Sequence, residues 1–113
     1  MTEILAGIPF LAVAHHDLRM FRTPGVYALT RRTGARRTLL HVGHAERVSA
    51  AYGGPAWTAA LEAGLNEALV NLAAARLDRL QIAAMLVRAY APPLNEAPGA
   101  SLPDRAPPAR RVL

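Results

Sequence analysis

Alternating positions along the first half of the chain predict a β-hairpin. From Val26 to Arg32, successive residues divide into two sets that would lie on opposite faces of a strand. Residues 38–43 have the composition of a returning strand, and Thr33 and Gly34 between the two segments are turn residues. We therefore expect residues 26–32 and 38–43 to pair as an antiparallel hairpin.

The segments around this hairpin carry mostly helical signals. Residues 1–24 contain short apolar runs and are expected to be packing segments that lead into the hairpin. Two short helices are expected near 44–52 and 57–63, followed by a strand near 68–72 and a long helix at about 74–89. Apolar residues, Leu77 and Leu80 among them, occur around most of the circumference of the long helix, which predicts that it is largely buried.

This order of elements predicts an α+β fold. It consists of a small three-stranded antiparallel sheet, made of the hairpin and the strand near 68–72, with flanking helices. A length of 113 residues fits one domain. We assign that domain to residues 1–96 and expect the segment 97–113, rich in proline and arginine, to be a flexible tail.

Composition excludes several classes of site. The chain has no cysteine, which excludes disulfides and thiolate metal sites. The apolar run from Ile4 to Ala14 is too short to span a bilayer, which takes about 20 residues, so no membrane partner is expected. The first residues lack the basic segment of a secretory signal, which favours a cytoplasmic location.

The net charge of +5 comes entirely from arginine, because the chain contains no lysine. Guanidinium groups bind phosphate in a bidentate manner, so a nucleic acid is a possible partner. A solvated loop is the alternative explanation for the arginines beside the hairpin turn. The candidate contacts to nucleic acid are the four arginines at this turn and one that follows the hairpin: Arg31, Arg32, Arg36, Arg37 and Arg47.

Three short motifs occur in an informative order. They are Gly25-Val26-Tyr27, then Leu40-His41-Val42-Gly43, and finally Pro92-Pro93-Leu94-Asn95 after the long helix. Over about residues 20–96, this order resembles the GIY-YIG nuclease domain, with His41 in place of the tyrosine of the second motif. The resemblance implies catalytic positions at Tyr27, His41, Arg47 and Asn95.

The resemblance also implies a metal-binding glutamate nine residues before the motif proline, where this chain has Ala83. Mg²⁺ prefers carboxylate oxygens, and no carboxylate on the long helix lies at an equivalent position. We therefore expect no cofactor and no metal site, with Mg²⁺ relevant only to an active nuclease.

Three functions stay open at this point. The first is a GIY-YIG-like domain that lacks metal-dependent nuclease activity and binds nucleic acid weakly or acts as an interaction module. The second is a divergent active endonuclease that cleaves phosphodiester bonds with His41 as general base. The third is an unrelated small α+β domain that binds a protein or a small ligand. The sequence does not distinguish DNA from RNA and does not specify an oligomeric state.

Overall fold

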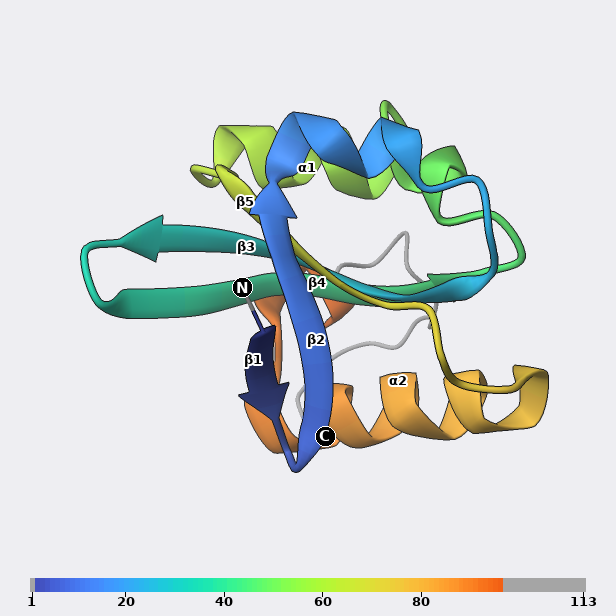
Figure 1. Cartoon of the computed structure of the whole chain (residues 1–113). Helices are drawn as coiled ribbons and strands as arrows, with labels where there is room; N and C mark the ends of the chain where they lie inside the picture. Colours follow the sequence, from blue (N-terminus) through green and yellow to red (C-terminus); the bar gives the residue numbers. More distant parts are fainter. Residues whose placement is uncertain (1, 97–113) are drawn as a thin grey trace.

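A five-stranded antiparallel sheet forms the centre of the computed structural model, which describes residues 2–96 (Figure 1). Its strands are β1 (Thr2–Leu5), β2 (Ile8–Ala14), β3 (Gly25–Thr33), β4 (Arg36–Ala45) and β5 (Glu67–Asn71). In space they follow the order β1-β2-β5-β3-β4, so β5 is central although it comes last in the chain. The expected tail at 97–113 lies outside the described residues.

Helices cover both faces of this sheet. One face carries the short 3-10 helices η1 (His15–Met20) and η2 (Val48–Ala51) together with α1 (Pro55–Glu62). The other face carries α2 (Arg76–Tyr90), drawn in orange below the sheet in Figure 1. The 3-10 helix η3 (Pro93–Glu96) follows α2. Among the described residues, no helix is long and apolar enough to cross a membrane.

The α+β class is confirmed, but the expectation of three strands is wrong. The lead-in forms a hairpin of its own, in which β1 pairs with β2, and β2 in turn pairs with β5. The connecting turn consists of Ala6 and Gly7, both with positive φ (51° and 83°), as a two-residue hairpin loop requires. Alanine seldom adopts that conformation, so the sequence gives little signal for this turn.

The central hairpin is confirmed. β3 and β4 pair antiparallel from Gly25↔Ala45 to Thr33↔Arg36, with an irregularity at Leu29 and Thr30. There Leu40 is the extra residue, because Leu29 pairs with His41 and Thr30 pairs with Leu39. This bulge allows Leu40 to pack on the α1 side of the sheet and Leu39 on the α2 side.

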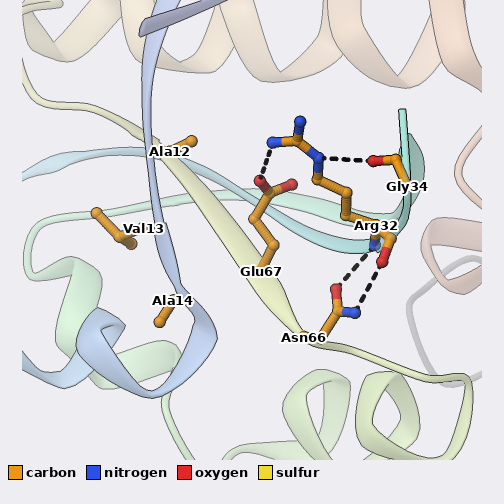
Figure 2. A pocket seen from close by; sticks show the side chains of 7 residues that line it. All are labelled: Ala12, Val13, Ala14, Arg32, Gly34, Asn66 and Glu67. Atoms are coloured by element: carbon orange, nitrogen blue, oxygen red, sulfur yellow. Dashed lines mark hydrogen bonds and ion pairs between the residues drawn. The ribbon is translucent and has the colours of Figure 1, made fainter. Parts of the chain in front are cut away.

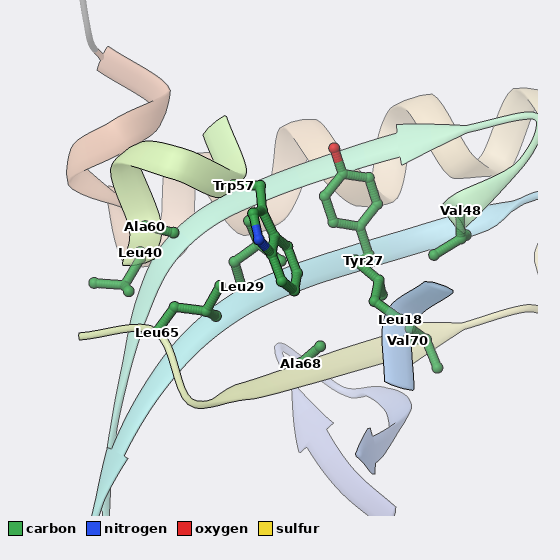
Figure 3. Packing of buried hydrophobic residues seen from close by; sticks show 10 residues of the cluster. All are labelled: Leu18, Tyr27, Leu29, Leu40, Val48, Trp57, Ala60, Leu65, Ala68 and Val70. Carbon is green, nitrogen blue, oxygen red and sulfur yellow. The ribbon is translucent and has the colours of Figure 1, made fainter. Parts of the chain in front are cut away.

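Each face of the sheet has its own apolar core. On the α1 side, Tyr27 and Leu29 pack with Trp57 and other side chains of the short helices (Figure 3). On the α2 side, the alternate residues Val26 and Ala28 pack against Leu86 of α2. Because β3 is buried on both faces, its residues from Gly25 to Thr30 are all buried, as is typical of a central strand.

Helix α2 occupies the expected segment but is less buried than its composition predicts. Leu77 is 79% exposed and Leu80 is also exposed, whereas the charged Arg79 is only 6% exposed. The helix lies on the sheet through a narrow stripe that includes Arg79, Ala83 and Leu86, spaced three or four residues apart. Counting apolar residues around the helix therefore misassigned its buried face.

Candidate nucleic-acid interface

The glycines of the first two motifs are explained by close packing. Gly43 lies opposite Tyr27 in the β3–β4 pair. A Cβ atom on Gly43 would come within 2.6 Å of Tyr27 Cζ, and it would also overlap the hydroxyl oxygen. A Cβ atom on Gly25 would lie 2.7 Å from the backbone oxygen of Asn71 in β5. The motif glycines thus let the tyrosine ring and the neighbouring strand approach β3 and β4 closely.

Tyr27 and His41 lie side by side on the α1 face of the sheet, with ring centroids 6.1 Å apart. Burial raises the pKa of Tyr27 above its usual value and lowers that of His41 below it. Both side chains are therefore uncharged at neutral pH. The Nδ1 atom of His41 is buried and has no hydrogen-bond partner among residues 2–96.

Asn95 binds the backbone of the second motif. Its Oδ1 accepts a hydrogen bond from Val42 N at 2.7 Å, and its Nδ2 donates one to Val42 O at 2.8 Å. Strand β4 is at the edge of the sheet, so these two bonds replace those that a further strand would make. The contacts show Asn95 fixing the edge strand that carries His41.

The four arginines at the hairpin turn differ in their surroundings. Arg37 makes a two-pronged pair with Glu67, at 2.6 and 2.8 Å, and also lies 3.0 Å from a carboxylate oxygen of Glu3. Arg31 donates to the backbone oxygen of Ala63 at 3.1 Å. Arg37 in particular is taken up by carboxylates of its own chain and is poorly placed to bind phosphate.

Arg32 belongs to the same network. Its side chain donates to Gly34 O at 3.1 Å and lies 3.5 Å from Glu67. Its backbone N–H donates to Asn66 Oδ1, and its backbone oxygen accepts from Asn66 Nδ2 (Figure 2). These side chains line a pocket of about 500 Å³ between β2 and the hairpin. Their polar atoms bind one another, so these side chains connect the hairpin to β5 and serve a structural purpose. Arg36 is exposed and makes no ion pair within residues 2–96.

A second group of arginines lies at the opposite end of the hairpin. Arg47 is exposed just before η2, and the residues after it bind the segment that leads into β3. Val48 N donates to Thr23 O at 2.9 Å, and Ser49 N donates to Phe21 O at 2.7 Å. These bonds place exposed Arg22 on a segment adjacent to that of Arg47, beside the first residues of the Gly25 motif.

Comparison with solved structures identifies the fold. Three crystal structures of the GIY-YIG N-terminal endonuclease domain of UvrC from Thermotoga maritima superpose on this chain. Each is a different point mutant of that domain, bound to its catalytic divalent cation. Their TM-scores are 0.57, 0.56 and 0.57 at 17%, 16% and 16% sequence identity. The alignments cover 74%, 71% and 74% of this chain and 94%, 91% and 94% of those domains. This chain has a GIY-YIG nuclease-like fold.

The comparisons at the level of sequence add nothing to this assignment, since no family model and no curated protein matches. At the identities above, the likeness establishes the GIY-YIG-like fold and leaves activity open. It argues against the third of the functions considered, an unrelated α+β domain whose motif matches arose by chance.

The position expected to match the metal-binding glutamate does not face Tyr27 and His41. Ala83 is 7% exposed and packs on the α2 side of the sheet, in the cluster with Val26 and Val42. Tyr27 belongs to the cluster on the α1 side. Even a glutamate at position 83 would therefore be separated from the tyrosine by the sheet.

Three glutamates of this GIY-YIG-like fold bind arginines of the same chain. Glu3 and Glu67 bind the hairpin arginines, and Glu46 binds Arg79 of α2 at 3.0 Å. Glu62 is exposed near the end of α1, five residues after buried Trp57 and so on a different side of the helix. Within residues 2–96, no group of three or more His, Cys, Asp or Glu side chains could hold a metal ion.

Sequence reasoning found the motif residues but missed Arg22 and Glu67. Arg22 is separated from Arg47 by 25 positions, and no local pattern connects the two. Glu67 was predicted to stand just outside its strand, but it is buried within β5 and binds Arg37 and Thr30. The sequence shows Glu67 only as an acidic residue beside an apolar run, which does not reveal its contacts with the hairpin.

Proposed function

We propose that this protein is a GIY-YIG-like domain that binds nucleic acid and does not cleave it with a metal ion. The observation that carries the proposal is the composition of the site. Exposed Arg22 and Arg47 lie on segments next to the strands that carry Tyr27 and His41. The carboxylates of Glu3, Glu46 and Glu67 are paired with other arginines of the chain.

Arginines in this position favour phosphate binding without hydrolysis. A guanidinium group matches the geometry of a phosphate and stays charged at any physiological pH. Cleavage of a phosphodiester also needs an activated nucleophile and further charge neutralisation, which metal-binding nucleases obtain from the cation. In this chain, uncharged Tyr27 and His41 offer hydrogen bonds but no carboxylate to hold such a cation.

A binding titration tests the first half of the proposal. Fluorescence anisotropy of a labelled duplex and a labelled single strand, measured at about 50 mM and about 200 mM salt, should show weak binding that declines with salt. Replacing Arg47 by glutamine should weaken binding and reduce the slope of affinity against salt by about one phosphate contact. The matched control is Arg88→Gln, which removes one exposed charge from α2 on the other face of the sheet.

The outcome of this titration also distinguishes a domain that binds nucleic acid from a module that binds another protein. Undetectable affinity for both forms of nucleic acid at about 50 mM salt would exclude the binding function and favour a protein partner. Equal losses in Arg47→Gln and Arg88→Gln would show that net charge, and not the site beside Tyr27, attracts the ligand.

A cleavage assay tests the second half. The protein is incubated with DNA and RNA in the presence of Mg²⁺ or Mn²⁺, and no product above that of a protein-free sample is expected. Metal-dependent cleavage that disappears in His41→Ala would establish the alternative of a divergent endonuclease. In that case, a buried imidazole that is neutral at pH 7 would have the correct protonation state for a general base.

A further inference from the structure

Four aromatic and imidazole rings form a continuous ladder on the α1 side of the molecule. Tyr52, which follows η2, lies 4.4 Å from Trp57 of α1 between ring centroids. Trp57 lies 5.7 Å from His15, and His15 lies 5.4 Å from His16, both in η1. Side chains from η1, from α1 and from the residue after η2 thus bring four rings into successive pairs, which we call the ring ladder.

The two ends of the ring ladder are accessible and its centre is not. Trp57 is buried in the core against Leu29 and Leu40, as Figure 3 shows. Tyr52 is 40% exposed although one side of its ring rests on Trp57, and the imidazole of His16 is also exposed. The buried tryptophan therefore supports an exposed tyrosine in a fixed position, where a further flat ring could stack.

Charged side chains flank the ring ladder at both ends. Arg47 and Tyr52 border η2, and the rise of a 3-10 helix places their backbones about 10 Å apart. Arg19 is three residues after His16 in η1, a spacing at which 3-10 side chains eclipse. Asp17, the acidic residue in this helix, lies 3.6 Å from His16 and offsets part of the positive charge.

We infer that the ring ladder is a stacking site for unpaired bases of single-stranded nucleic acid. This inference rests on the proposed function and specifies which form of nucleic acid the domain prefers. Bases in a duplex already stack on each other, whereas the faces of unpaired bases are free to stack on Tyr52. Arg47 and Arg19 lie where the phosphates of the same strand would pass.

The test compares two tyrosines of similar exposure on opposite faces. Tyr52→Ala removes the ring at the accessible end of the ladder. Tyr90→Ala is the control, because Tyr90 is 42% exposed but lies on α2, where its hydroxyl accepts a hydrogen bond from Ala6 N. Affinity for a labelled single strand should fall between about 5-fold and about 150-fold in Tyr52→Ala, the range for loss of one stacked base. Tyr90→Ala should leave it unchanged, and Tyr52→Phe should retain wild-type affinity.

Trp57 provides a second, local measurement. It is the single tryptophan of the chain, and it contacts both Tyr52 and His15. Saturation with a single strand should therefore change its fluorescence, and the change should be absent with a duplex of the same length. His16→Ala, at the other end of the ladder, should also weaken single-strand binding without altering the environment of Tyr52.

The possible results separate this inference from the proposed function. Absence of binding to either form of nucleic acid would overturn both. Two results would overturn only the inference that the ring ladder stacks on bases. One is equal affinity of Tyr52→Ala and Tyr90→Ala for the single strand. The other is a preference for duplex with no change in Trp57 fluorescence on binding. Thermal unfolding shows whether each variant is folded. If Tyr52→Ala does not fold, the affinity of His16→Ala and the fluorescence of Trp57 decide whether the ring ladder binds unpaired bases.

Discussion

Replacing Asn95 by alanine should destabilise the domain far more than the same change at Asn66. Both asparagines bind one residue of a strand through its N–H and its C=O. Asn95 binds Val42 at 2.7 and 2.8 Å, and Asn66 binds Arg32 at 2.8 and 2.9 Å. The two sites have the same chemistry and nearly the same geometry, and they differ in burial.

Burial decides the expected magnitude. Val42 is only 2% exposed, so Asn95→Ala leaves a buried donor and a buried acceptor without partners. Each such group costs about 1–3 kcal/mol, which gives a loss of about 2–4 kcal/mol once some relaxation is allowed. Arg32 is exposed, so water replaces the amide of Asn66 there. The loss in Asn66→Ala should be about 1 kcal/mol or less.

The assay is equilibrium unfolding in urea, monitored by far-ultraviolet circular dichroism. We expect the same slope m for wild type, Asn95→Ala and Asn66→Ala, so that the midpoints report the difference in stability. The difference between the two variants should be at least about 1 kcal/mol. Equal losses would refute the argument that desolvation of the β4 edge makes the motif asparagine necessary. A small loss in Asn95→Ala would show that the chain replaces these two bonds.

Three further predictions concern stability. Ala83→Glu should lose about 3–5 kcal/mol and gain nothing from Mg²⁺, because it buries an unpaired charge, whereas Ala84→Glu on the exposed side of α2 should change stability by about 0.5 kcal/mol or less; thermal melts that are equal, or that rise with Mg²⁺, would contradict this placement. Hydrogen bonding to its arginine partner lowers the pKa of Glu67, so its contribution is present above the unfolded pKa of about 4.3 and is lost as the pH falls. Glu67→Gln should therefore be less stable than wild type at pH 7, and urea titrations should show this gap narrowing towards pH 3; a constant gap would argue against it. Gly43→Ala should lose about 1–3 kcal/mol by overlap with the motif tyrosine, and Gly54→Ala, whose Cβ meets its nearest neighbour at 3.6 Å, should lose less; the reverse order in thermal melting would show that the ring can move aside.

Local patterns were sufficient wherever neighbours in the sequence are also neighbours in space. The β3–β4 hairpin follows from alternation around Thr33 and Gly34, because its pairing requires only a short turn. The end of α2 follows from two prolines, which cannot continue a helix. The motifs at Gly25 and His41 are informative for the same reason, since the cross-strand contact of Tyr27 with Gly43 is part of one hairpin.

Prediction failed where the partner of a residue is remote. The strands β1 and β2 join the sheet through β5, more than 50 residues later in the chain, and their turn contains an alanine with positive φ. The buried face of α2 includes Arg79, whose charge is paired with Glu46 at 3.0 Å and which also donates to the backbone oxygen of Ala74 at 3.3 Å. The periodicity of residues along α2 cannot reveal an ion-pair partner that lies outside the helix.

The sequence by itself determined the α+β class, the central hairpin, the long C-terminal helix and the order of motifs that resembles a GIY-YIG domain. The tertiary structure alone decided that Ala83 faces away from Tyr27, that Arg37 is bound by Glu67, and that the segment of Arg22 is hydrogen-bonded to the segment that follows Arg47. It also placed the ring of His15 beside that of Trp57, which contacts Tyr52. The physical reason is that backbone propensity and turn chemistry act between near neighbours, whereas the face on which a side chain is buried depends on packing between distant segments.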